Sequence, residues 1–235
     1  MNQSPYQLVV DATADDYRKH ILGNPLLDKL QKGAVTVQHY ASYLLETFHL
    51  VRHTSRALAL AASRTEDSQR GLRAWLLEQA NEEHGHELFC VKDLRHFGYS
   101  YDDIATREPG LGAWSMVTQN YYLATHGHPA GILGVASATE QMGSELAGAL
   151  SAVVASRLQV GPNALTFLRS HSSFDVKHLD EVKKAINEFA ISDIVRRQVV
   201  LARRYTLRHY GQLFLDVADQ DNSHMRVEQP IAIAA

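Results

Sequence analysis

Three side chains that can bind metal recur at helical spacing in the last third of the chain. His171, Asp175 and His178 stand at positions i, i+4 and i+7, so in a helix they share one face, about one turn apart. A mixture of imidazole and carboxylate suits a first-row metal such as iron or manganese, whereas calcium prefers oxygen ligands alone. An exposed polar helix face has the same spacing, so the motif needs further ligands elsewhere to indicate a metal site.

A second pair, Glu83 and His86, forms a Glu-x-x-His sequence. Helical bundles with two-metal carboxylate sites use this i, i+3 pair to chelate one metal and bridge to the second. Gly85 lies between them, and a glycine inside a helix costs about 1 kcal/mol relative to alanine. That cost indicates close packing or room for a ligand, and a solvated polar face is the alternative.

Two further carboxylates stand in apolar surroundings. Glu46 has leucine, phenylalanine and valine on nearly every side, and Glu140 follows the uncharged segment 132–139. Buried carboxylates need a partner, which a metal supplies. For Glu46 a salt bridge to Arg52 or Arg56 is the alternative. Small residues around Glu140 allow neighbouring helices to approach closely.

Together these residues provide four carboxylates and three histidines from four predicted helices. Such a set can hold two divalent metals with positions open for oxygen or substrate. The predicted metal ligands are Glu46, Glu83, His86, Glu140, His171, Asp175 and His178.

The elements that must position these residues are helices almost throughout. Apolar residues recur at spacings of three and four, no segment alternates strictly, and only 6 of 235 residues are proline. We expect a single all-α domain over residues 1–218, followed by a tail over 219–235. The predicted helices cover residues 14–31, 36–63, 65–97, 111–126, 130–158, 163–189 and 191–217, with a connector over 99–110.

With these motifs, residues 36–217 resemble the heme-oxygenase-like di-iron oxidases and oxygenases, known as iron-containing redox enzymes. The resemblance implies a seven-helix heme-oxygenase-like bundle without heme, two Fe(II)/Fe(III) ions held by the seven residues above, and O2 as co-substrate. Some members space the acid and the histidine differently, so Glu82 is an alternative to Glu83. His49, which forms another Glu-x-x-His with Glu46, is expected to lie in the core or beside the ligands.

The resemblance also implies the reaction class. We expect O2-dependent oxidation of a small metabolite, an amine or amino acid, by N-oxygenation, oxidative decarboxylation or C–C cleavage. Relatives similar to thiaminase II and pyrroloquinoline-quinone synthase use the same fold without metal, so a metal-independent hydrolase or a cofactorless oxidase is the alternative. A bundle that binds metal or a partner without catalysis is the third possibility.

Clues to the substrate come from the last predicted helix. Arg204 and Arg208 lie on one face and would hold a substrate carboxylate through paired hydrogen bonds if they point inward. The alternative is that they are surface residues, as most arginines are.

Composition excludes several other classes. The net charge of −3 gives no support to nucleic-acid binding, and the single cysteine, Cys90, excludes a disulfide framework or a cysteine-based metal cluster. No signal peptide or membrane-length apolar segment is found. We therefore expect a cytoplasmic enzyme with a small-molecule substrate, no nucleic-acid or membrane partner, and by analogy a possible homodimer.

Overall fold

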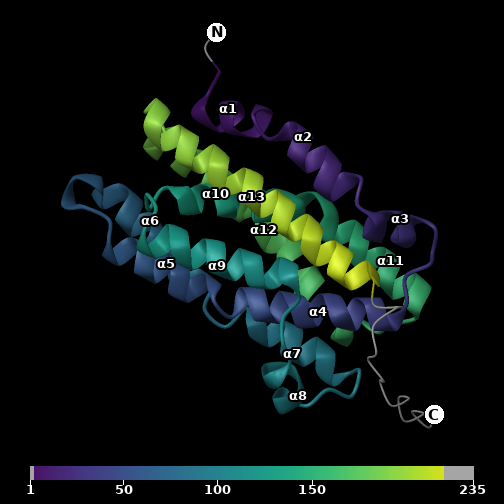
Figure 1. The fold of residues 1–235 in the computed structure, drawn as a ribbon. Coiled ribbons are helices and arrows are strands. Elements are labelled where there is room, and N and C mark those ends of the chain that lie inside the picture. The colour runs from purple at the N-terminus through teal and green to yellow at the C-terminus, as the bar shows by residue number, and fades with distance from the viewer. Residues whose placement is uncertain (1–2, 220–235) are drawn as a thin grey trace.

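The computed structural model describes residues 3–219, apart from the side chains of residues 173–176. In this part of the chain every regular element is helical, which confirms the predicted all-α class. Figure 1 shows α12 and α13 as long helices, with α1 to α3 running along α13 at one edge of the bundle. The α-helices are α1 (Pro5–Asp11), α2 (Ala14–Tyr17), α3 (Pro25–Gln31), α4 (Val37–Val51), α5 (Thr54–Ser63), α6 (Arg70–Glu82), α7 (Glu87–Arg95), α8 (Tyr101–Thr106), α9 (Leu111–Thr125), α10 (Gly131–Met142), α11 (Gly148–Leu158), α12 (Thr166–Phe189) and α13 (Asp193–Ala218).

Several predicted helices are divided in the structure. The helix expected over 65–97 breaks between α6 and α7, where Gly85 has φ +88°. Glycine adopts this left-handed conformation at little cost, so Gly85 ends a helix instead of weakening one. The prediction of a Glu-x-x-His within a continuous helix is therefore wrong, and the motif lies in a turn. The helix expected over 36–63 also breaks, between α4 and α5.

The N-terminal region differs from the prediction as well. The helix expected over 14–31 is interrupted before α3, where the Asn24 side chain accepts a hydrogen bond from the Leu26 amide and Pro25 begins the new helix. Helix α1 was not predicted, and α8 lies inside the expected connector. The segments expected over 111–126, 163–189 and 191–217 agree with α9, α12 and α13 to within a few residues.

Helices α10 and α13 approach each other closely at the centre of the bundle. A side chain at Gly134 would place its Cβ 2.2 Å from the backbone oxygen of Val199, so only glycine fits there. Beside this crossing the fully buried Arg203 donates hydrogen bonds to Thr13 and Ser137. The predicted close packing around Glu140 is thus confirmed, and α10 is held firmly where it carries that carboxylate.

Helix α10 continues without interruption through a π-helical segment, Gly143–Ala147, into α11. Single π-helical turns inside longer helices are frequent at functional sites. No helix in residues 3–219 is both long enough and apolar enough to cross a membrane.

Candidate metal centre

Glu83 stands at the centre of the predicted ligands, at the C-terminal end of α6. Its carboxylate lies 3.4 Å from Nδ1 of His86, which precedes α7. Burial alone would raise the pKa of Glu83, but the neighbouring imidazoles of His86, His171 and His178 outweigh burial and lower it. The turn at Gly85 therefore brings an ionised carboxylate and an imidazole together at the edge of the bundle core.

His171 is oriented by its own helix, α12. Its Nδ1 lies 2.9 Å from the carbonyl oxygen of Phe167, which can only accept, so Nδ1 carries the proton. Burial lowers the pKa of His171, which favours the neutral ring with an unprotonated Nε2. Metal-bound histidines show this same arrangement, with one nitrogen held by a carbonyl and the other facing the metal. The ring centre of His171 lies 5.2 Å from that of His86.

His178, two helical turns further along α12, lies between two carboxylates. Its Nδ1 is 3.5 Å from Glu140 on α10, and its Nε2 is 3.4 Å from Glu82 on α6. The hydrogen bond to Glu140 is the main reason that the pKa of His178 is raised. One ligand atom each from Glu83, Glu140 and His178 lies within 4.8 Å of the other two, which is a spacing that a single metal ion can bridge.

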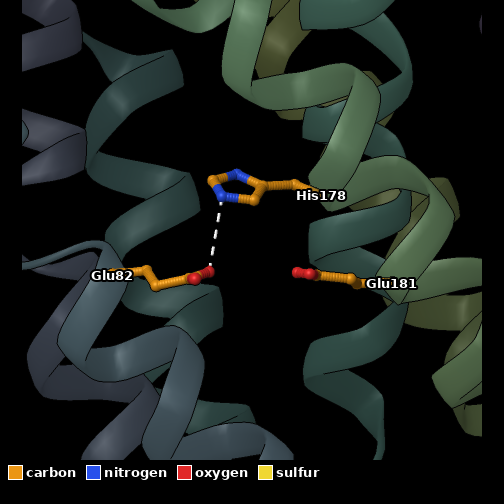
Figure 2. Close-up of side chains that lie close together, drawn as sticks. All are labelled: Glu82, His178 and Glu181. Carbon is orange, nitrogen blue, oxygen red and sulfur yellow. Dashed lines mark ion pairs between the residues drawn. The ribbon is translucent and has the colours of Figure 1, made fainter.

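A second group shares His178 on its other side. Glu82, His178 and Glu181 also offer ligand atoms within 4.8 Å of one another, and Figure 2 shows the two carboxylates facing each other beside the imidazole. The ammonium of Lys177 lies 2.9 Å from Glu82 and 3.2 Å from Glu181. Lys177 therefore supplies a positive charge to Glu82 and Glu181. A metal ion bound by these two carboxylates would have to share them with the Lys177 ammonium or displace it.

Glu181 was missed by the sequence analysis. It stands three residues after His178 and so continues the helical face of the His171 motif, a spacing that the sequence already contains. Glu82, the alternative to Glu83 as a ligand, contacts a different side chain from the one that Glu83 contacts. Glu83 faces His86 and Glu140, whereas Glu82 faces the other nitrogen of His178.

The donor set fits a first-row divalent metal better than calcium or magnesium. It combines carboxylate oxygen with imidazole nitrogen, and these side chains are mostly buried. His178 can bind a metal through one nitrogen while the other is held by a carboxylate, as is usual around metal-bound histidine.

Among the described residues, Glu46 belongs to neither of these groups of ligand atoms, contrary to expectation. Its carboxylate accepts a 2.8 Å hydrogen bond from the backbone amide of Gly110, at the start of α9. Asp216 on α13 accepts a similar bond from the amide of Gly112. Both carboxylates thus satisfy free amides at a helix N-terminus, where the helix dipole favours negative charge. We therefore correct the ligand assignment of Glu46 to a helix-capping role.

The side chain of Asp175 lies outside the described residues. Arg204 and Arg208 both pair with Asp16 on α2, at 3.2 and 2.8 Å, and neither lines the cavity described below. The expected carboxylate anchor is therefore not formed by this pair, because α2 supplies its counter-ion on the outside of the bundle.

His49 lies in the core, which is one of the two positions expected for it. It is buried, and this burial lowers its pKa to about 4.

Comparison with known proteins identifies the family. A sequence profile described as iron-containing redox enzyme matches residues 41–216. The chain belongs to this family. No curated protein sequence matches the chain.

Solved structures share the fold at low sequence identity. A domain of unknown function with a heme oxygenase-like fold from Shewanella denitrificans OS217 has a TM-score of 0.84 and 22% identity, over 92% of each chain. Heme oxygenase-2 from Synechocystis sp. PCC 6803, in complex with heme and NO, has a TM-score of 0.73 and 13% identity, over 92% of this chain and 86% of that chain. A TenA homologue from Pseudomonas syringae pv. tomato DC3000 has a TM-score of 0.71 and 15% identity, over 91% and 92%. These likenesses confirm the heme-oxygenase-like fold.

A cavity of about 140 Å³ adjoins the metal-ligand candidates of this redox enzyme. Glu83, Glu140 and His171 form part of its wall, and most of the remaining wall is aliphatic or aromatic. The volume is close to that of an engineered apolar cavity of about 150 Å³ that binds benzene. The arrangement places a polar, metal-competent wall against an apolar space large enough for a small molecule.

Proposed function

We propose that this family member is a non-heme di-iron oxidase or oxygenase that uses O2 to oxidise a small metabolite, an amine in preference to an amino acid. The observation that carries the proposal is the convergence of Glu83, Glu140 and His178 beside a largely apolar cavity. The exclusion of Arg204 and Arg208 from the cavity wall removes the feature that favoured a substrate carboxylate. N-oxygenation is the candidate reaction for an amine, and oxidative decarboxylation or C–C cleavage is the candidate reaction for an amino acid.

The protein's own residues have separable tasks in this proposal. Glu83, Glu140, His86, His171 and His178 would hold the ions, with Asp175 completing the α12 motif. When bound, iron supplies the activation of O2 and the electron transfer that amino-acid side chains cannot provide.

Positioning and exclusion of water are the remaining tasks. The Phe167 carbonyl fixes the orientation and protonation of His171, so that its Nε2 is ready to bind without rearrangement. The apolar wall keeps water away from the substrate and limits side reactions. Glu82 and Glu181 would orient His178 from its other nitrogen or take part in the second ion's site.

A metal-independent enzyme is the second candidate, and the likeness to TenA homologues favours it. The single cysteine speaks against a thiol nucleophile here. Cys90 is completely buried, burial raises its pKa well above the usual range, and it does not line the cavity.

The two candidates are separated by anaerobic titration of the metal-free protein with Fe(II), followed by rapid mixing with O2 and optical detection. The di-iron proposal predicts binding of about two equivalents and a transient visible absorption, both reduced in His171→Ala. His126→Ala, in a histidine outside the cluster, is the matched control. Absence of iron uptake, together with turnover that resists a chelator, would favour the metal-independent candidate.

A further inference from the structure

Among the polar side chains of the cavity wall, Asn120 presents an amide oxygen that receives no hydrogen bond from the described part of the protein. Asn120, on α9, is 6% exposed and lines the cavity. Its Oδ1 is buried and accepts no hydrogen bond from any described residue. Buried polar groups in folded proteins nearly always have a partner, and an exception calls for a ligand or a water molecule. Helix α9 contributes none of the metal-ligand candidates, so this amide is a polar feature separate from the metal centre.

The charges around the cavity restrict what that ligand can be. Glu83 and Glu140 belong to its wall, and none of the described wall residues is lysine or arginine. An anionic group would enter this space without a positive side chain to compensate for lost hydration. A hydroxyl or amine group, by contrast, can donate directly to the Asn120 oxygen.

We propose that Asn120 recognises a small, largely apolar ligand through an O–H or N–H group of that ligand, and that in the metal-free protein the cavity rejects ligands bearing a carboxylate. The volume of about 140 Å³ accommodates a group of roughly benzene size, or about six to eight non-hydrogen atoms. This inference rests on the proposed function for its biological meaning, because the same cavity adjoins the proposed metal centre. Ligand binding itself requires no metal and can be measured separately.

The test compares three probes of equal chain length in the metal-free, full-length protein. Hexan-1-ol carries a donor, 1-methoxypentane has the same number of non-hydrogen atoms without a donor, and hexanoate carries the negative charge. Trp75 lines the cavity and Trp114 is 60% exposed, so a Trp114→Phe background leaves one indole as a fluorescence reporter of binding. Calorimetric titration provides the independent readout.

We expect hexan-1-ol to bind about 5- to 10-fold more tightly than 1-methoxypentane, the effect of one buried hydrogen bond. Asn120→Leu keeps the branching of the side chain but removes its polar atoms, and should abolish this difference. Asn163→Leu makes the same substitution at an exposed position and should leave it unchanged. If Asn120→Leu fails to fold, Asn120→Asp retains an acceptor oxygen and should keep the preference for the alcohol over the ether.

Two results would overturn the proposal. Equal affinity for the alcohol and the ether in the wild-type protein would show that Asn120 does not select a donor. Binding of hexanoate as tight as that of hexan-1-ol would show that the cavity accepts anions. Failure of the iron titration would leave both probe comparisons intact, so a failure of the proposed function is distinguishable from a failure of this inference.

Discussion

Replacing Glu46 separates a helix-capping role from a metal-ligand role. The side chain is 5% exposed and accepts a 2.8 Å hydrogen bond from the amide of Gly110. In Glu46→Ala this amide at the start of α9 loses its acceptor, and the loss of a helix cap costs about 1 kcal/mol. Removal of one buried methylene adds about 0.8 kcal/mol. We therefore expect a loss of about 2 kcal/mol, or a fall in Tm of about 4–8 °C for a chain of this length.

Glu46→Gln adds a pH-dependent test of the same contact. Burial raises the pKa of Glu46 above its ordinary value of 4.5, so the folded state holds the proton more tightly than the unfolded state. Stability from this group is therefore greatest below the unfolded pKa and falls as the pH rises through the raised folded pKa. The glutamine oxygen still accepts from Gly110 and carries no charge. We expect Glu46→Gln to lose this pH dependence and to gain stability relative to wild type at neutral pH.

The assay is thermal unfolding of the metal-free variants followed by circular dichroism at pH 4 to 8, with Fe(II) stoichiometry measured in parallel. The capping role predicts that both variants keep the iron stoichiometry of the wild type. Loss of about one iron per chain in Glu46→Gln, with thermal stability unchanged across this pH range, would refute the reasoning and restore Glu46 as a ligand.

Three further outcomes follow from the structure. Glu140→Gln should weaken Fe(II) binding at least 10-fold in calorimetric titration, and unchanged affinity would remove Glu140 from the metal centre. Gly134→Ala should destabilise the fold by more than about 2 kcal/mol in urea unfolding, because its Cβ would meet a backbone oxygen 2.2 Å away, whereas Gly161→Ala meets nothing within 4 Å and should change stability little. The double variant Arg204→Gln/Arg208→Gln should bind hexan-1-ol with an affinity within twofold of the wild type, because both side chains pair with Asp16 outside the cavity. A larger loss of affinity would place them in the binding site.

Local spacing predicted the part of the site that one helix carries. His171 and His178 lie on the same helix, and their relation follows from helix geometry alone. Glu140 could be predicted because an acid after a long uncharged segment needs a buried partner, and the structure supplies His178.

The partners of Glu46, Arg204 and Arg208 are set by contacts between distant helices, which local sequence patterns do not reveal. Glu46 is as buried as predicted, but its partner is a backbone amide 64 residues away instead of a metal-ligand cluster. Asp16 likewise draws Arg204 and Arg208 to the outside of the bundle from a helix near the N-terminus. Such pairings depend on how distant helices are arranged, and a single sequence does not contain that arrangement explicitly.

Helix boundaries likewise depend partly on local sequence signals and partly on contacts between segments that are distant in the sequence. The left-handed conformation at Gly85 is a local signal, since glycine favours it, but glycine is also tolerated inside helices. Helix α4 packs against α7 and α5 packs against α6, so the breaks at Gly85 and after α4 depend on contacts between helices, which the spacing of apolar residues alone does not reveal.

In the proposed function, two iron ions bind where α6, α10 and α12 meet. The most direct test of this proposal is a crystal structure of the protein loaded anaerobically with Fe(II), with anomalous scattering recorded on both sides of the iron absorption edge. The di-iron proposal predicts two iron peaks among Glu83, Glu140, His171 and His178, and no peak beside Glu46. An iron-free cluster in crystals that retain iron elsewhere, or a peak bound by Glu46, would contradict it.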